Sequence, residues 1–570
     1  MTKDQALRRA ALVFALLGLG VLAVVGRLVQ LQVVEHEEWL ALAQAIQEDV
    51  VEIPQRRGTI YDRNGLPLAC DVPGYSIALD NYHMTKPELL VGLLEEVLGL
   101  APDEAADKVY RSSYFTWLAR RVDRRVGEEL QARAEELGIE GLLFFDSWVR
   151  AYPQGRLAPE VLGVVGVDGQ GLAGLELAYE ELLRGSPARY HVLRGRDGRV
   201  YDLWVEEPGQ PGQDLVLTLD ATFQRVCERN ISAGLEDYEA GRGFALIMDP
   251  ATGAVLALAQ APRYDPVNPD PNLLHPWAVT DVFEPGSTFK ALVGLAALDQ
   301  GVVTADTMLS GDSPFIVGRT RIENALGESY GTITFRVAIA RSVNTALVQV
   351  ALRLGRERLY EYLVRMGFGR PTGIELPGEA AGILRPPEEW TDLDLAVASF
   401  GQGVAVTGLQ LGAAFCALAN GGELPQVHLV ETVVEPVTQV ASPAACRAMR
   451  ELMRFAVTAA NGTCWAVRLP GYGVAAKSGT GQKAVEGGYS DEVVVGDMVA
   501  MFPWQAPEYV ILVAYDDLPA RYWNQVTMQV EYRWGGSTAG PTISAIIRGL
   551  EGEGAIAPYP SEMTAPGRSG

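Results

Sequence analysis

A serine and a lysine three residues apart have the types and the spacing of a nucleophile and its base. Ser287 and Lys290 lie in the segment EPGSTFKALVG, where Pro285 and Gly286 interrupt the preceding structure. Residues at i and i+3 share one face of a helix, so the lysine amine can take the proton of the serine hydroxyl. The amine must be neutral to do this, and burial beside a second cation would lower its pKa. We expect Ser287 to begin an amphipathic helix whose N-terminus adds positive potential beside the nucleophile.

A second segment offers a hydroxyl and an amide. Ser342 and Asn344 lie in the tripeptide SVN, between two apolar helical segments. In a tight loop both side chains can face one cleft, where the hydroxyl relays a proton and the amide holds a substrate amide. Taken alone, this tripeptide is better explained as a helix cap.

A third segment, KSGT, ends the apolar strand that we expect in GVAAKSGTGQ, and it comprises Lys477, Ser478, Gly479 and Thr480. Strand alternation places Lys477 and Gly479 on one face and the two hydroxyls on the other. The lysine can be the second cation that lowers the pKa of Lys290, the hydroxyls can bind a carboxylate, and the glycine permits close approach. A simple strand-end turn is the alternative for this segment in isolation.

The segments around these motifs predict an α+β domain over residues 241–550. The stretch FALIMDPATGAVLALA reads as two strands joined by a turn, and VVVGDMVAMF and EYVILVAY are further strand candidates. Helices and strands alternate without a regular β-α-β rhythm, which favours a mainly antiparallel sheet flanked by helices. Thr407 with Gln410, and Ser442 with the proline after it, mark two helix starts.

The N-terminal third has a different organisation. The run from Ala10 to Gly26 is continuously apolar, with basic residues before it and acidic residues after it. That asymmetry predicts an uncleaved anchor over residues 1–33 with the N-terminus in the cytoplasm, and a cleavable signal peptide is the alternative. Residues 34–240 predict an elongated α+β pedestal or dimerisation domain, with a helical stalk at its start, short strands, and an amphipathic helical region from Pro87 to Leu137. Residues 551–570 predict a flexible tail.

Composition limits the function classes. The chain has 570 residues and a formal net charge of −24, which disfavours binding to nucleic acid because no basic face is available in bulk. The five histidines are isolated, so we expect neither a metal nor another cofactor. The five cysteines are scattered, and only Cys446 with Cys464 is a weak candidate for a disulfide.

The ordered set S-x-x-K, S-x-N and K-[S/T]-G is the signature of serine penicillin-recognising enzymes. The chain resembles the class B penicillin-binding proteins over nearly its whole length. RRGTIYDRNG, YPQGRLAPEVLGVVGVDGQGLAGLE and SFGQGVAVTGLQL resemble further segments of that family. Asn344 and the segment TGIELPGE favour the cell-division or sporulation branch over the elongation branch.

The resemblance implies a peptidoglycan D,D-transpeptidase with an acyl-enzyme on Ser287. Lys290 would be the general base, Ser342 would pass a proton to the leaving amine, and Asn344 would contact the donor stem peptide. A last group would engage the terminal D-alanine carboxylate or a β-lactam: Lys477, Ser478 and Thr480. The backbone N–H groups of Ser287 and Thr480 would form the oxyanion hole.

The resemblance also implies a single-pass protein of the cytoplasmic membrane with an extracytoplasmic catalytic domain. Because no segment resembles a glycosyltransferase, partners would include a membrane polymerase of the SEDS family and divisome proteins. Two alternatives stay open. A penicillin sensor or non-catalytic scaffold would need an effector domain, for which the residues before Ala10 leave little room, and a D,D-carboxypeptidase or β-lactamase would use water as the acceptor.

Overall fold

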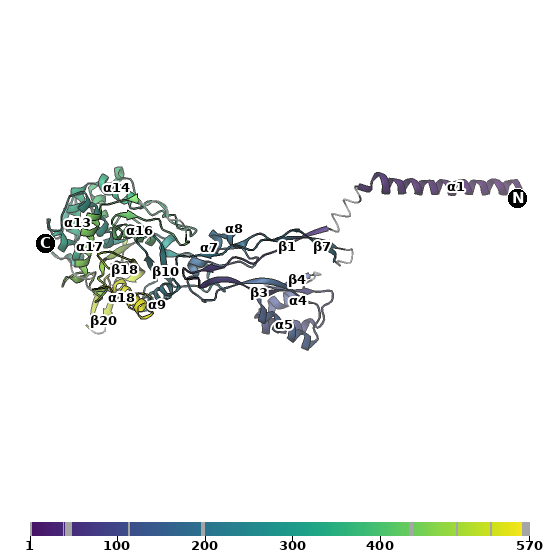
Figure 1. The fold of residues 1–570 in the computed structure, drawn as a ribbon, viewed down its shortest axis with the longest axis horizontal. Coiled ribbons are helices and arrows are strands. Elements are labelled where there is room, and N and C mark those ends of the chain that lie inside the picture. Colours follow the sequence, from purple (N-terminus) through teal and green to yellow (C-terminus); the bar gives the residue numbers. More distant parts are fainter. Residues whose placement is uncertain are drawn as a thin grey trace. The chain divides into compact units, whose positions relative to one another are not determined.

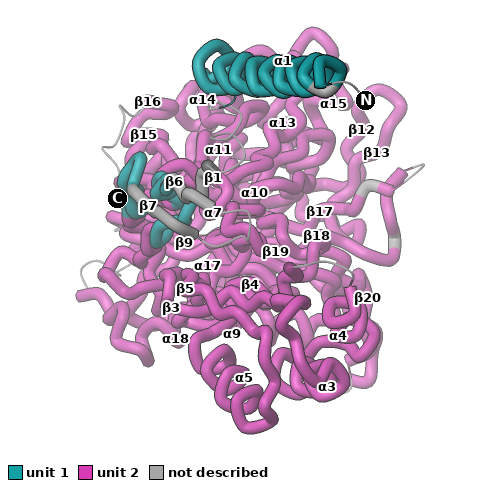
Figure 2. The backbone as a smooth tube through the Cα atoms, turned by 90° about the vertical axis from the view of Figure 1, so that its right-hand side faces the viewer, with its two compact units in different colours: residues 1–57, 184–213 teal, residues 58–183, 214–570 magenta. Residues whose placement is uncertain are grey.

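The computed structural model describes residues 3–37, 39, 48–111, 115–194, 200–431, 438–485, 488–524 and 527–560. The chain divides into two compact units, coloured separately in Figure 2. Unit 1 comprises residues 1–57 and 184–213, and unit 2 comprises residues 58–183 and 214–570. The candidate site residues all belong to unit 2.

Unit 1 contains the apolar N-terminal helix and a small sheet. Helix α1 (Lys3–Val29) continues into a π-helical turn (Gln30–Val34), and together these 32 residues are long and apolar enough to cross a membrane. Three antiparallel strands follow in the order β1-β6-β7: β1 (Glu48–Ile53), β6 (Ala188–Arg194) and β7 (Val200–Glu207). Most of the expected stalk helix lies outside the described residues.

The first part of unit 2 is built around one long strand, β3 (Pro67–Asp80), labelled in Figure 1. It pairs with β2 (Ile60–Tyr61), β4 (Phe115–Asp123) and β5 (Leu142–Ala151), and β2 also pairs in parallel with β8 (Leu215–Val216). The expectation of short strands was therefore wrong for β3. The helical region expected over residues 87–137 was also wrong in part, because β4 interrupts it. The helices here are α3 (Pro87–Leu98), α4 (Pro102–Val109), α5 (Arg124–Leu137), α6 (Pro159–Leu162), α7 (Gly174–Ala178) and α8 (Glu180–Arg184).

A buried ion pair fixes this part of the chain. Arg150 on β5 donates to Glu176 on α7 at 2.7 Å, to Asp71 on β3 at 3.1 Å and to the carbonyl of Gly58 at 2.8 Å. A buried charge is tolerated only when it is paired and hydrogen-bonded in this way. Through Gly58 and Glu176, these contacts join two segments that resemble the family, RRGTIYDRNG and the one that runs from Tyr152 to Glu176.

The remainder of unit 2 is organised by a five-stranded antiparallel sheet in the order β10-β9-β19-β18-β17, which confirms the expected α+β fold. Its strands are β9 (Arg242–Met248), β10 (Val255–Ala261), β17 (Ala475–Val485), β18 (Gly488–Phe502) and β19 (Tyr509–Pro519). Successive residues of β19 alternate between two apolar clusters, with Leu512 in one and Val513 in the other. Both faces of the sheet are therefore covered.

The two faces carry different helices. One face packs against α9 (Ala221–Tyr238) and α18 (Ala539–Gly552). The other lies against a larger apolar cluster, and the helices that contribute to this cluster are α10 (Trp277–Thr280), α11 (Lys290–Asp299), α12 (Phe335–Ala340), α13 (Asn344–Leu354), α14 (Arg356–Arg365), α16 (Gly408–Ala419) and α17 (Pro443–Thr458). Helix α15 is Asp392–Ala398. The expected capping box of Thr407 and Gln410 begins α16, and Ser442 caps α17.

Short pairs of strands decorate the domain: β11 (Met308–Ser310) with β14 (Thr332–Thr334), β12 (Phe315–Val317) with β13 (Thr320–Ile322), β15 (Glu423–Leu424) with β16 (Thr438–Gln439), and β20 (Arg521–Asn524) with β21 (Gln529–Tyr532). Single 3-10 turns lie at Pro271–Leu273, Ala325–Gly327, Pro387–Glu389 and Trp465–Val467.

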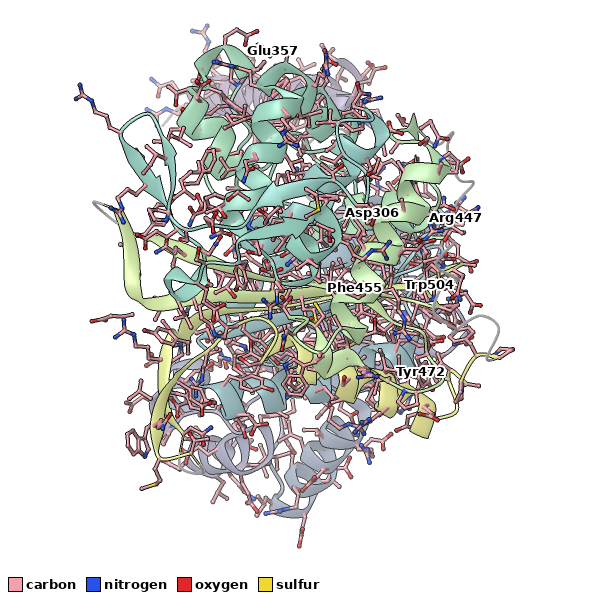
Figure 3. All side chains as sticks on the ribbon, turned by 90° about the vertical axis from the view of Figure 1, so that its left-hand side faces the viewer. Asp306, Glu357, Arg447, Phe455, Tyr472 and Trp504 are labelled. Atoms are coloured by element: carbon pink, nitrogen blue, oxygen red, sulfur yellow. The ribbon has the colours of Figure 1, made fainter. Side chains whose placement is uncertain are left out.

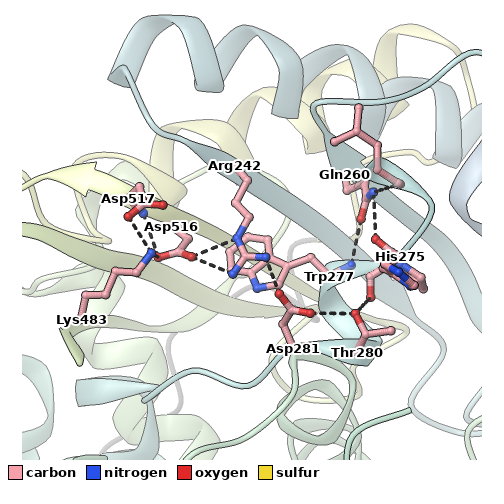
Figure 4. Close-up of polar contacts among 11 residues, drawn as sticks. Arg242, Gln260, His275, Trp277, Thr280, Asp281, Lys483, Asp516 and Asp517 are labelled. Atoms are coloured by element: carbon pink, nitrogen blue, oxygen red, sulfur yellow. Dashed lines mark hydrogen bonds and ion pairs between the residues drawn. The ribbon is translucent and has the colours of Figure 1, made fainter. Parts of the chain in front are cut away.

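A charged network joins the strand ends of the sheet (Figure 4). Asp516 on β19 accepts from Arg242 on β9 at 2.9 Å and pairs with Lys483 on β17 at 3.0 Å. Arg242 also pairs with Asp281, and its guanidinium lies 4.6 Å from the centre of the Trp277 ring. Three strands and the segment after α10 are thereby held together at one end of the sheet.

The expected tail does not begin at residue 551. Ile556 is buried, the N–H of Tyr559 donates to the carbonyl of Gly471 at 2.8 Å, and the Tyr559 ring lies 6.3 Å from that of Tyr472, which is labelled in Figure 3. Residues 551–560 thus pack on the domain, and residues 561–570 lie outside the described part. Apolar side chains at 556 and 559, overlooked among Gly and Pro, cause this packing.

Candidate active site

Ser287 lies on a short turn in front of a buried helix. Gly286–Phe289 forms one turn of 3-10 helix, and α11 starts at Lys290. Ser287 is partly exposed, whereas Lys290 is fully buried. The expected amphipathic helix was wrong on two counts, because the α-helix begins three residues later and every residue from Lys290 to Ala297 is buried. The placement of nucleophile and lysine one turn apart agrees with the expectation.

Lys290 contacts both functional residues of the SVN turn. Its Nζ lies 2.6 Å from the carbonyl oxygen of Ser342, 2.6 Å from Oδ1 of Asn344 and 3.1 Å from Oγ of Ser342. Nδ2 of Asn344 donates to the carbonyl of Glu323 at 2.8 Å, which fixes the orientation of the amide. Asn344 therefore holds the amine of Lys290 in place.

These contacts suit a neutral amine. Burial first, and the charge of Lys477 second, hold the pKa of Lys290 well below its usual value. A neutral amine has two N–H donors and one lone pair. The carbonyl of Ser342 and Oδ1 of Asn344 can only accept, so they take the two donors. The lone pair is left for a hydroxyl, which is what a general base requires.

Lys477 reaches the same hydroxyl from the sheet. Its Nζ donates to Oγ of Ser342 at 3.0 Å and to the carbonyl of Ser478 at 2.8 Å. Burial lowers the pKa of Lys477 to about 8, against the opposing influence of Cys464 and Asp497. Ser342 therefore sits between two lysines, and its hydroxyl can accept from Lys477 while it donates to Lys290. This arrangement is a path for a proton.

The SVN turn is built to present that hydroxyl. α12 ends at Ala340 and α13 begins at Asn344, and Ser342 between them has a φ of 58°. A serine seldom adopts this left-handed conformation. The conformation directs both the carbonyl and the hydroxyl of Ser342 at Lys290.

The KSGT segment lies within β17, not at its end, because the strand continues to Val485. The expected alternation is correct: Lys477 faces Ser342, whereas Ser478 donates to the hydroxyl of Thr463 at 3.0 Å. The hydroxyl of Thr480 accepts from the N–H of Gly535 at 3.2 Å. Ser478 and Thr480 therefore lie on the same strand as Lys477 with their hydroxyls held by neighbours.

Three backbone segments meet at Gly286, beside the nucleophile. A Cβ at Gly286 would lie 2.5 Å from the carbonyl oxygen of Thr480, and the N–H of Gly286 donates to the carbonyl of Gly401 at 3.2 Å. Only glycine allows this approach, since its φ is also +54°. The backbones at Ser287 and Thr480 are thus adjacent, and the SFGQG segment that contains Gly401 supports them.

Sequence reasoning missed two residues beside the site. Thr288 and Asp497 are both fully buried, and the Thr288 hydroxyl is hydrogen-bonded to the Asp497 carboxyl. The signal for Asp497 was present, because it is the one acidic residue in the otherwise apolar stretch VVVGDMVAMF. The weak disulfide candidate was wrong, since Cys446 and Cys464 are both free.

Comparisons with known proteins agree with this geometry. Residues 243–547, more than half of the 570-residue chain, match the model of the penicillin-binding protein transpeptidase domain. Residues 52–217 match the penicillin-binding protein dimerisation domain. Along the chain, the match to the dimerisation domain precedes the match to the transpeptidase domain.

Named relatives extend over most of the chain. The protein "Probable peptidoglycan D,D-transpeptidase PenA" of Neisseria meningitidis is 31% identical over 508 residues, which cover 87% of this chain and 84% of that protein. "Stage V sporulation protein D" of Bacillus subtilis is 29% identical over 92% of this chain and 82% of that protein. "Peptidoglycan D,D-transpeptidase FtsI" of Escherichia coli is 27% identical over 95% of this chain and 91% of that protein.

Solved structures share the fold. Penicillin binding protein 2X from Streptococcus thermophilus superposes with a TM-score of 0.72 at 23% identity, covering 91% of this chain and 82% of that one. A peptidoglycan synthetase from Bifidobacterium adolescentis gives a TM-score of 0.70 at 25% identity, covering 90% of this chain and 98% of that one. With a serine-lysine pair, a dimerisation domain and a transpeptidase domain on one polypeptide, this chain belongs to the class B penicillin-binding proteins.

Proposed function

We propose that this protein is a peptidoglycan D,D-transpeptidase that works through an acyl-enzyme on Ser287. The observation that carries the proposal is the convergence of Lys290 and Lys477 on Oγ of Ser342, at 3.1 and 3.0 Å. A base, a proton relay and a cation thus meet one helical turn from an accessible serine. Relatives named as peptidoglycan D,D-transpeptidases support the same reaction.

In the first half-reaction, Ser287 Oγ attacks the carbonyl carbon between the two terminal D-alanines of a donor stem peptide. Its proton passes to the neutral amine of Lys290, and the backbone N–H groups of Ser287 and Thr480 stabilise the oxyanion. The C–N bond then breaks. Ser342 relays a proton to the leaving nitrogen, and free D-alanine departs.

In the second half-reaction, the amine of a neighbouring stem peptide attacks the ester carbon. Lys290 takes a proton from this amine and returns it to Ser287 Oγ as the ester C–O bond breaks. The new amide bond is the cross-link. A β-lactam would form the same ester on Ser287 by opening its ring.

The substrate carboxylate is proposed to bind beside KSGT. Lys477 supplies the positive charge, while Ser478 and Thr480 offer hydroxyls and Gly479 leaves room. Asn344, whose amide holds Lys290, is proposed to border the donor peptide.

Labelling and product assays test the reaction. Wild-type protein is expected to be labelled covalently by a fluorescent penicillin, and the S287A variant is not; labelling of S287A would contradict the assignment. When an acceptor amine is present, the release of D-alanine should be accompanied by formation of a new amide between the donor peptide and that amine. Release that ignores the acceptor amine would favour the carboxypeptidase reaction, and turnover of penicillin would favour a β-lactamase.

For location, we propose that Lys3–Val34 anchors the protein in the cytoplasmic membrane as a single pass, with the catalytic domain outside. Basic residues precede the apolar run and acidic residues follow it, in support of this orientation. Protease added to intact spheroplasts should digest the catalytic domain; protection of that domain would contradict the orientation.

We also propose that the enzyme serves septal or spore wall synthesis together with a SEDS-family polymerase and divisome proteins. Relatives named FtsI and stage V sporulation protein D support this choice of process. A fluorescent fusion is expected at division septa or forespores. Uniform labelling of the sidewall, or no co-purification of a polymerase from detergent extracts, would count against it.

A further inference from the structure

Asp497 is a carboxyl group with no exposed surface, placed directly behind the KSGT segment. It lies on β18 opposite Gly479 on β17, and opposite Ala514 on the other neighbouring strand, β19. A Cβ at Gly479 would overlap both Oγ1 of Thr288 and Oδ2 of Asp497. The two side chains therefore fill the space that the glycine leaves.

Counting protons assigns a state to this carboxyl. Oγ1 of Thr288 lies 2.8 Å from the carbonyl oxygen of Pro285 and is also hydrogen-bonded to Oδ1 of Asp497. A hydroxyl has one proton, which cannot serve two acceptors. Both contacts are hydrogen bonds if Asp497 is a neutral acid that donates to Thr288, while Thr288 donates to Pro285. Oδ2 of Asp497 has no hydrogen-bond partner among the described residues, which costs less for a neutral acid than for a carboxylate.

These contacts connect the two halves of the reaction centre. Pro285 and Thr288 flank the turn that carries Ser287, whereas Asp497 is paired in register with the strand that carries Lys477. The three-group chain from Asp497 to Thr288 to Pro285 is thus a link between nucleophile and sheet.

Resting on the proposed function, we propose that Asp497 is a positioning residue for acyl transfer: as a neutral acid it donates to Thr288 and so holds the Ser287 turn against the strand of Lys477. Ionisation of Asp497 takes away the donated proton. Thr288 must then turn its own proton from Pro285 to the carboxylate, and the turn loses its fixed partner.

The groups around Asp497 place its ionisation near neutral pH. Burial raises the pKa of Asp497 to about 7, against the Thr288 hydroxyl and the charge of Lys477, both of which favour the ionised form. The groups beside the carboxyl are Thr288 from the nucleophile turn and Gly479 and Lys477 from β17, while Ala514 on β19 is a register partner and Gly535 lies against the backbone carbonyl of Asp497. Among the residues that the structure describes, Lys477 is the titratable member of this set, and Lys477 in turn acts on Lys290.

An ionised Asp497 would also act on the bases. A negative charge beside Lys477 offsets the field that this lysine exerts on Lys290, and therefore raises the pKa of Lys290. Less of the amine is then neutral. Both effects slow acylation as the pH rises through the ionisation of Asp497.

The test is the rate of labelling by a fluorescent penicillin between pH 5.5 and 8.5, for wild type and the isosteric variant D497N. The amide that D497N introduces can donate to Thr288 but cannot ionise. We expect the wild-type rate to fall by about tenfold around pH 7, because the Ser287 turn loses its fixed partner, and D497N to lack this fall. D497A, which lacks the donor, is expected to be slower by about 10- to 100-fold at pH 6, as for a misplaced nucleophile. D306N, an exposed acid labelled in Figure 3, is the matched control and should follow the wild type.

The outcomes separate the two proposals. Labelling of S287A would overturn the proposed function whatever the pH profile shows. A D497N profile that superimposes on the wild type, with S287A unlabelled, would overturn the role of Asp497 alone. If D497A does not fold, T288V and T288S decide: the serine should restore the wild-type rate and pH step, and the valine should not. Equal rates for T288V and wild type would also overturn the role.

Discussion

Lys290 and Lys477 contact one and the same hydroxyl oxygen, Oγ of Ser342, although one lysine lies on a buried helix and the other on a sheet. Two buried amines this close cannot both be charged without cost, so one is driven neutral. Lys290, whose pKa is lowered by burial and by the charge of Lys477 and which has the serine nucleophile one turn away, is the neutral one. The predictions below follow from this division of roles and from the packing that maintains it.

Replacement of Lys290 should remove the base without removing the fold. We expect K290A to acylate more slowly by about 10²- to 10⁴-fold, the usual contribution of a general base. K290R should not recover the rate, because arginine cannot be deprotonated. The measurement is the second-order rate constant for penicillin labelling, with K483A as the control on the same strand as Lys477. A K290R rate near that of wild type would contradict the assignment.

The positive charge of Lys477 should make the KM for a peptide substrate depend on pH. Because burial lowers the pKa of Lys477 to about 8, KM for a D-Ala-D-Ala peptide is expected to rise as the pH passes this value, by about tenfold per pH unit. A peptide whose terminal carboxylate is amidated lacks the partner for this charge. It should bind more weakly and show no such rise, and parallel KM profiles for the two peptides would argue against a carboxylate contact.

A methyl group at Gly479 should disturb both the strand and the nucleophile turn. The Cβ of G479A would fall far inside van der Waals contact with Thr288 and Asp497. We expect a loss of about 1–3 kcal/mol of stability and a larger loss of acylation rate. Thermal melting and penicillin labelling measure the two effects. G318A is the control, because a Cβ at Gly318 would meet no atom within 4 Å; its rate of penicillin labelling should be unchanged.

Much of this site was predictable because the chemistry dictates short, ordered motifs. Ser287 with Lys290, the SVN turn and KSGT were each recognisable, and the antiparallel hairpin before them was visible as two apolar runs joined by turn residues. What could not be predicted depends on register. Asp497 meets Gly479 only because two strands pair with a particular offset, and nothing local to either residue states that offset. Strand β4 was missed for a similar reason: it exposes the apolar Phe115 and Trp117 and buries the polar Thr116, so its hydropathy does not reveal the strand until β3 is placed beside it.

A buried pair of acids, Glu160 and Glu228, should make stability depend on pH. Glu160 accepts from the N–H of Gln260 at 3.2 Å, and Glu228 accepts from the N–H of Ala158 at 2.7 Å and is paired with Arg263. Burial, with Glu228 second, raises the pKa of Glu160 to about 8. A group whose pKa is raised on folding stabilises the fold at low pH, and this contribution is lost as the pH rises from about 4.5 through about 8.

E160Q, which keeps the shape but not the charge, should abolish that loss. Its melting temperature is expected to exceed that of wild type increasingly from pH 5 to pH 8, as measured by calorimetry. The control is E357Q, an exposed residue that Figure 3 labels. Melting curves for E160Q and wild type that shift in parallel with pH would show that Glu160 is not held in its neutral form by the fold.

The left-handed conformation of Ser342 lowers the stability of the fold at a position that the proposed activity requires. Glycine would occupy a φ of 58° with less strain than serine, so the fold alone would prefer glycine at this position. Serine occupies this position despite the backbone strain, because glycine has no hydroxyl that could bond to both amines. A substitution to glycine would therefore increase the stability of the fold and abolish the activity.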